Sequence, residues 1–167
     1  MPAQRQDYIL GQIQLLRQFV ARLLRRREEA GLNEAIQLAM HLQEKLFGMP
    51  AADFLRMEVS QQIATLQKGE SKEEGHAKCL AYATLLKETA ALYAIKEQPD
   101  LAAGARQLAL HVVLSVAVNQ PVNDSSAHLL LAELTADLGD MELHPPVREL
   151  QEQLDQRDSD GKKSFKA

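Results

Sequence analysis

The segment 101–118 most constrains the fold of this chain, because it is apolar on almost every side. Wound as an α-helix, it carries one narrow polar stripe, formed by Gln107, His111 and Ser115. A helix that is apolar nearly all round must be covered by neighbouring elements on most of its sides. We therefore predict that this segment is a central helix and that the other elements pack around it.

The composition favours helices throughout. Ala, Leu, Gln, Glu and Arg dominate, whereas the β-branched and aromatic residues typical of strands are sparse. Apolar residues recur at helical spacing between short turns, and short connections make successive helices antiparallel neighbours. We therefore predict an all-α fold without a sheet, with about seven helices in antiparallel hairpins that form a TPR-like array or bundle. The predicted helices cover residues 6–29, 33–47, 52–67, 72–96, 101–118, 125–138 and 145–156.

The chain is long enough for one domain with a sizeable core, which we place at residues 1–156. Residues 157–167 are charged, and we expect them to form a flexible tail. At Arg25–Arg27 the first helix should leave the core, since cations suit the negative end of the helix dipole, and Asn33 can cap the second helix. Ser71 and Glu74 have the spacing of a capping box.

Two segments resemble parts of a tetratricopeptide repeat. Residues 31–36 are similar to the start of a repeat's second helix, and Ala109 followed by Pro121 is similar to that helix's small residue and closing proline. At positions 97 and 116, where the repeat pattern requires small residues, this chain has Glu and Val. The pattern is therefore TPR-like and departs from the true repeat.

The first predicted helix carries a second resemblance. Residues 7–13, Asp-Tyr-Ile-Leu-Gly-Gln-Ile, run into an apolar helix. This start resembles that of a small uncharacterised bacterial family, a domain of unknown function, whose members continue with TPR-like helices. The resemblance covers roughly residues 6–140. It implies an all-helical fold, and it brings no known activity and therefore no catalytic residues.

The charge gives no reason to expect nucleic acid or an anionic membrane as partner, since the net value is −4. The basic end of the first predicted helix, Arg22 and Arg25–Arg27, could contact phosphates, but Glu28 and Glu29 follow at once and no aromatic residue is interleaved. The single cysteine, Cys79, excludes an intramolecular disulfide and fits a reducing compartment. The longest nearly apolar run, 108–118, is shorter than the ~20 residues of a membrane span. We expect a cytoplasmic protein without a membrane span.

Two further constellations invite a chemical interpretation. His76 and Cys79 lie one helical turn apart and could supply half of a zinc site, although Cys79 falls on an apolar face where free cysteine packs as a small hydrophobe. The stripe of Gln107, His111 and Ser115 could line a ligand groove, or it could be a hydrogen-bonded packing detail. No nucleophile–base pair or phosphate-binding loop is recognisable in the sequence. We therefore expect that the protein is not an enzyme and binds no cofactor.

The sequence thus favours a non-enzymatic protein–protein interaction module. Its groove candidates are Gln107, His111 and Ser115, and its partner would be a protein, a peptide or another copy of the chain. The apolar arc of the first helix is broad, and Tyr8, Leu15 and Phe19 are candidates for self-association into a homodimer. The alternative is a helical protein that binds a small ligand or a metal through the polar stripe of the central helix.

Overall fold

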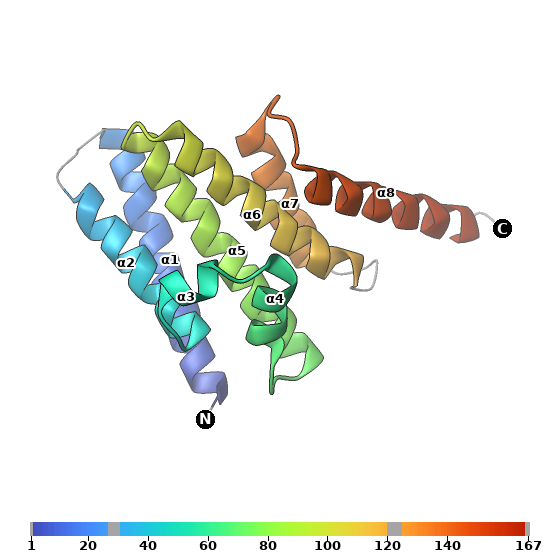
Figure 1. Ribbon diagram of the computed structural model, residues 1–167, viewed down its shortest axis with the longest axis horizontal. Helices are drawn as coiled ribbons and strands as arrows, with labels where there is room; N and C mark the ends of the chain where they lie inside the picture. Colours follow the sequence, from blue (N-terminus) through green and yellow to red (C-terminus); the bar gives the residue numbers. More distant parts are fainter. Residues whose placement is uncertain (1, 27–30, 120–124, 166–167) are drawn as a thin grey trace.

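The structure, a computed structural model, describes residues 2–26, 31–119 and 125–165. Within these ranges it contains eight α-helices and no strand, which confirms the predicted all-α class; the TPR-like arrangement stays a prediction. The helices are α1 (Pro2–Arg26), α2 (Leu32–Phe47), α3 (Ala51–Leu55), α4 (Val59–Gln67), α5 (Lys72–Ile95), α6 (Pro99–Val118), α7 (Ser125–Leu138) and α8 (Pro145–Phe165) (Figure 1).

Two helices, α5 and α6, form the centre of the molecule. Helix α6 packs against α4, α5, α7 and α8, so the predicted central helix is confirmed. It shares this place with α5, which packs against α1, α2, α4, α6 and α7. The central position of α5 could not be predicted from its sequence, because its buried residues include the polar Glu88 and Thr89. The molecule is therefore layered, with α1 and α2 at one end and α8 at the other (Figure 1).

The prediction of one continuous helix over residues 52–67 is wrong, because the helix is interrupted at residues 56–58 and forms two helices, α3 and α4. The side-chain amide of Gln62 donates a hydrogen bond of 3.1 Å to the carbonyl oxygen of Met57. This bond replaces a backbone partner at the start of α4, and such side-chain competition is a common cause of helix interruption. Gln62 is itself held by Tyr82, twenty residues away, so the break depends on a tertiary contact.

The helix ends agree with the sequence in part. Ser71 caps α5 as predicted, since its hydroxyl accepts a hydrogen bond of 3.2 Å from the backbone amide of Glu74. Asn33 is not a cap, because α2 begins at Leu32 and the cap is Gly31, whose φ of 95° is costly for residues with a side chain. The predicted end of the first helix, near Glu29, lies outside the described residues.

Helix α8 is longer than predicted, since it extends to Phe165 and includes most of the expected tail. The Nη1 atom of Arg157 donates hydrogen bonds of 2.7 and 2.9 Å to the carbonyl oxygens of Ala117 and Val118. A guanidinium at the carboxyl end of α6 satisfies carbonyls that the helix leaves unpaired. This anchor continues α8 beyond its thin apolar stripe, and no local sequence pattern indicates it.

By length and composition alone, α6 is long and apolar enough to cross a membrane, and half of its most apolar window is buried in the fold. The core helix of a folded domain has the same properties. The absence of a membrane span therefore stays a prediction.

Three aromatic rings join α2, α3 and α5. Phe47 and Phe54 stack with ring centroids 3.6 Å apart, and Tyr82 meets both rings edge-on, at 5.1 and 5.4 Å. The hydroxyl of Tyr82 donates a hydrogen bond of 2.9 Å to Oε1 of Gln62, and both side chains are fully buried. Burial raises the pKa of Tyr82, so its phenol stays protonated and keeps donating this bond.

We expect Tyr82→Phe to lower the free energy of unfolding by about 1–3 kcal/mol, because Oε1 of Gln62 would remain buried without its partner. Urea unfolding followed by circular dichroism measures the change. Tyr93→Phe, at a half-buried tyrosine of the same helix, is the matched control and should change stability by less than about 0.5 kcal/mol. Equal effects of the two substitutions would contradict the importance of the buried bond.

Candidate functional site

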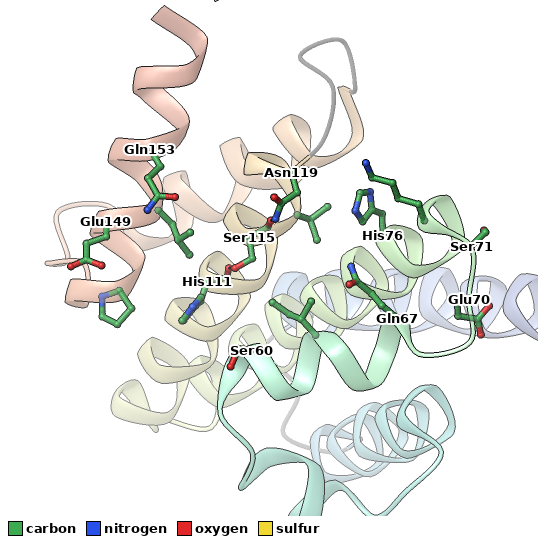
Figure 2. A pocket seen from close by; sticks show the side chains of 15 residues that line it. Ser60, Gln67, Glu70, Ser71, His76, His111, Ser115, Asn119, Glu149 and Gln153 are labelled. Carbon is green, nitrogen blue, oxygen red and sulfur yellow. Dashed lines mark hydrogen bonds between the residues drawn. The ribbon is translucent and has the colours of Figure 1, made fainter. Parts of the chain in front are cut away.

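The candidate site is a groove over the exposed side of α6, which we call the α6 groove. Its volume is about 920 Å³. The floor comes from α6, one wall from α4 and the beginning of α5, and the other wall from α8. Figure 2 shows His111 and Ser115 between Glu149 and Gln153 on one side and Ser60, Gln67 and His76 on the other. The full lining is Ser60, Ile63, Gln67, Glu70, Ser71, Lys72, His76, His111, Ser115, Val116, Asn119, Pro146, Glu149, Leu150 and Gln153.

The structure divides the predicted polar stripe of the central helix. His111 and Ser115 line the groove, as the sequence suggested for them. Gln107 does not, because it is buried with 4% of its surface exposed. Its Nε2 donates a hydrogen bond of 3.0 Å to the carbonyl oxygen of Glu142, and its Oε1 accepts one of 3.1 Å from the backbone amide of His144. Gln107 therefore holds the segment that leads into α8, and we correct its assignment as a groove residue.

The polar atoms of the groove floor are partly occupied by local bonds. The hydroxyl of Ser115 donates a hydrogen bond of 2.8 Å to the carbonyl oxygen of His111. The amide of Asn119 donates one of 2.8 Å to the carbonyl oxygen of Ser115. The hydroxyl oxygen of Ser115 keeps its lone pairs for a ligand donor, and the amide oxygen of Asn119 can accept as well. The floor thus offers hydrogen-bond acceptors toward the groove.

His111 is the ionisable group of the floor. Partial burial lowers the pKa of His111 below its usual 6.5, so the imidazole is neutral at pH 7. A neutral imidazole carries one donor and one acceptor nitrogen. His111 can therefore hydrogen-bond a polar ligand, and it would resist protonation in the folded state.

The wall formed by α4 and α5 depends on close packing. A Cβ atom at Gly75 would lie 2.9 Å from Cγ of Gln67, so glycine is needed where α5 passes the end of α4. At the rim, Nζ of Lys78 lies 2.7 Å from Oε1 of Glu70, and the hydrogen bond from Lys78 lowers the pKa of Glu70. The Glu70 carboxylate at this rim is thus compensated within the chain.

His76 and Cys79 do not form a metal site together. His76 lines the groove, whereas Cys79 is fully buried beneath it. Burial raises the pKa of the Cys79 thiol to about 11, so it stays a thiol at neutral pH. Among the described residues, no three His, Cys, Asp or Glu side chains are grouped closely enough to hold a metal ion. The apolar packing of Cys79 that the sequence favoured is what the structure shows.

A second ionic cluster lies away from the groove and joins α1, α5 and α7. Oε1 of the buried Glu88 lies 3.3 Å from Nε of Arg17 and 3.9 Å from Nζ of Lys87. Both cations also approach Glu133, at 3.7 and 3.6 Å. Burial raises the pKa of Glu88, although Lys87 and Arg17 oppose that shift. The carboxylates and cations of this cluster satisfy one another, so we assign it to packing.

Sequence reasoning missed most of the groove, because its walls come from side chains that look like solvated helix faces. Ser60, Gln67, Glu149 and Gln153 carry no pattern that distinguishes them from other surface residues. The thin apolar stripe of the last helix did indicate an element lying on the surface. It did not indicate that this element lies beside His111 and Ser115.

The self-association candidates also fall in two groups. Tyr8 and Leu15 are exposed to 56% and 57% of their surfaces. Phe19 is half-buried, packs against the core and lies under the guanidinium of Arg22 at 5.8 Å. The exposed surface of α1 therefore includes Tyr8 and Leu15, whereas Phe19 packs inward, with its ring beside Gly31.

Comparisons with known proteins add no relative. A scan against protein-family models, a search of curated proteins and a search of solved structures each give no match to this chain.

We expect the free energy of unfolding to contain a contribution from His111 that falls as the pH drops below 6.5. The unfolded chain takes up a proton near that pH, whereas the folded state resists protonation until the pH is lower. Urea unfolding at pH 7.5 and at pH 5.5 should therefore show a larger loss of stability on acidification for the parent than for His111→Gln. Parallel pH profiles of the two proteins would contradict the burial of this imidazole.

Proposed function

We propose that the protein is a non-enzymatic interaction module whose α6 groove accepts a segment of a partner protein. The observation that carries this proposal is the groove itself, whose floor is the uncovered side of an otherwise buried helix. Helical arrays commonly bind their partners along such surfaces. A TPR-like scaffold with a protein partner, as expected from the sequence, is part of the same proposal.

The lining suits a peptide segment. The side chains of Ser60, Gln67 and Gln153 can each donate and accept hydrogen bonds, as a peptide backbone requires, and the hydroxyl oxygen of Ser115 can accept them. Ile63, Val116 and Leu150 also line the groove and offer apolar contact to side chains of the segment.

The charges of the lining favour a segment of low net charge. The acidic and basic residues of the lining, apart from its histidines, are Glu70, Lys72 and Glu149, and Glu70 is already paired with Lys78. No strong field of one sign remains to select a highly charged partner. We therefore expect a polar segment with interspersed apolar residues.

A small molecule is the second candidate ligand. The groove volume of about 920 Å³ lies within the range of ~300–1,000 Å³ typical of small-molecule sites, and two imidazoles, His76 and His111, line it. A peptide-library selection and a small-molecule screen would distinguish a peptide ligand from a small-molecule ligand.

Selection from a random peptide library should recover peptides that bind the parent protein. Gln153→Trp should weaken their binding by about tenfold or more, because the indole would fill the groove beside α6. Asp155→Trp is the matched control, since Asp155 is an exposed residue of α8 that does not line the groove. Isothermal titration calorimetry measures both affinities.

Peptides that bind the two tryptophan variants equally well would contradict docking in the groove. A thermal-shift screen of small molecules is the parallel experiment. Stabilising compounds that lose their effect in Gln153→Trp, together with no selected peptide, would favour the small-ligand candidate.

A further inference from the structure

A second surface, on α1, is not explained by the fold of one chain. We call it the α1 stripe, and it consists of Tyr8, Gly11, Leu15, Gln18 and Arg22, all exposed. These residues follow one another at intervals of three and four, so they lie in one line along the helix. The stripe is about 21 Å long, given a rise of 1.5 Å per residue. Helix α1 itself lies, with α2, toward the end of the molecule opposite α8 (Figure 1).

Gly11 has no role in the folded chain that the structure reveals. A Cβ atom at this position would meet nothing within 4 Å, although glycine weakens a helix interior. Its exposed neighbours along the stripe, Tyr8 and Leu15, are large and apolar. The stripe thus carries a protruding apolar side chain at Leu15 and, one helical turn away, an open position at Gly11 that could receive such a side chain.

This arrangement is complementary to itself. The interval of the stripe is that of the a and d positions of a coiled coil, and in antiparallel pairs an a residue of one helix meets a d residue of the other. A two-fold axis near residue 13 places Leu15 of each copy over Gly11 of the other, and Tyr8 over Gln18. A two-fold interface repeats each contact twice, so one match of knob and hole supplies two.

Charge along the stripe is light. Nζ of Lys45 lies 5.2 Å from the centre of the Tyr8 ring, so at this end of the stripe Tyr8 also has a contact within its own chain. Between residues 8 and 21 the exposed face of α1 is uncharged except at Arg17, which is paired with Glu88 and Glu133. We propose that the α1 stripe is an antiparallel, two-fold interface with a second copy of this chain, in which Leu15 packs over Gly11. The surface is separate from the α6 groove, so either proposal can fail without the other.

Disulfide trapping tests both the partner and the register. Gln14 is exposed and flanks the stripe next to the two-fold axis, so Gln14→Cys should give a disulfide-linked dimer as the main product of mild oxidation. Ala21→Cys is the matched control, because it is exposed on the same side of α1 but its two copies would lie about 24 Å apart along the axis. Cys79 is fully buried and does not compete.

A second variant separates association from folding. Gly11→Leu adds a side chain that meets nothing in its own chain and strengthens the helix, so the melting temperature should be unchanged or higher. The same side chain fills the place for Leu15 and should raise the dimer dissociation constant at least tenfold. Sedimentation velocity between about 10 µM and about 1 mM covers the range expected for so short an interface.

The proposal would be overturned by either of two results. One is equal cross-linking of the Gln14→Cys and Ala21→Cys proteins. The other is an association state that Gly11→Leu leaves unchanged, which includes a parent protein that stays monomeric over the whole concentration range.

Discussion

The structure depends on the burial of two neighbouring helices, α5 and α6, against each other. Each is apolar or small over most of its circumference, so each requires cover from several sides. Helices α1 and α2 cover α5, α7 and α8 cover α6, and α4 packs against both. The cover of α6 is incomplete along the line of His111 and Ser115. The groove therefore exists because the surrounding helices do not cover α6 completely. The side of α6 that they leave uncovered carries polar residues.

The outer wall of the groove is fixed by polar anchors as well as by apolar burial. Helix α8 contributes only a thin apolar stripe, in which Val147 and Leu154 are buried. At its beginning Gln107 holds the segment 142–144, and further along Arg157 binds the last carbonyls of α6. Hydrogen bonds are directional, whereas apolar contact allows sliding. These two anchors therefore set the position of α8 along α6 and, with it, the width of the groove.

Much of the fold could be predicted from the sequence, because helix periodicity and turn residues are local signals. The burial of the segment 101–118, the capping of α5 by Ser71 and the apolar packing of Cys79 all followed from such signals. The failures share one cause, which is contact between distant residues. Gln62 and Tyr82 interrupt a helix, and Arg157 reaches α6 from 39 residues away. The walls of the candidate site are of the same kind, since Gln67 and Gln153 are brought together only by tertiary packing.

The two proposed surfaces do not compete for the same helices. The groove uses α4, α5, α6 and α8, and the stripe uses α1, which lies at the opposite end of the molecule (Figure 1). A dimer formed through α1 would therefore carry two accessible grooves. When a partner contains two suitable segments joined by a linker of adequate length, the second binding event becomes intramolecular and overall affinity rises without new contacts. A weak groove and a weak dimer interface would then reinforce each other, because each bound bivalent partner also holds the two copies together.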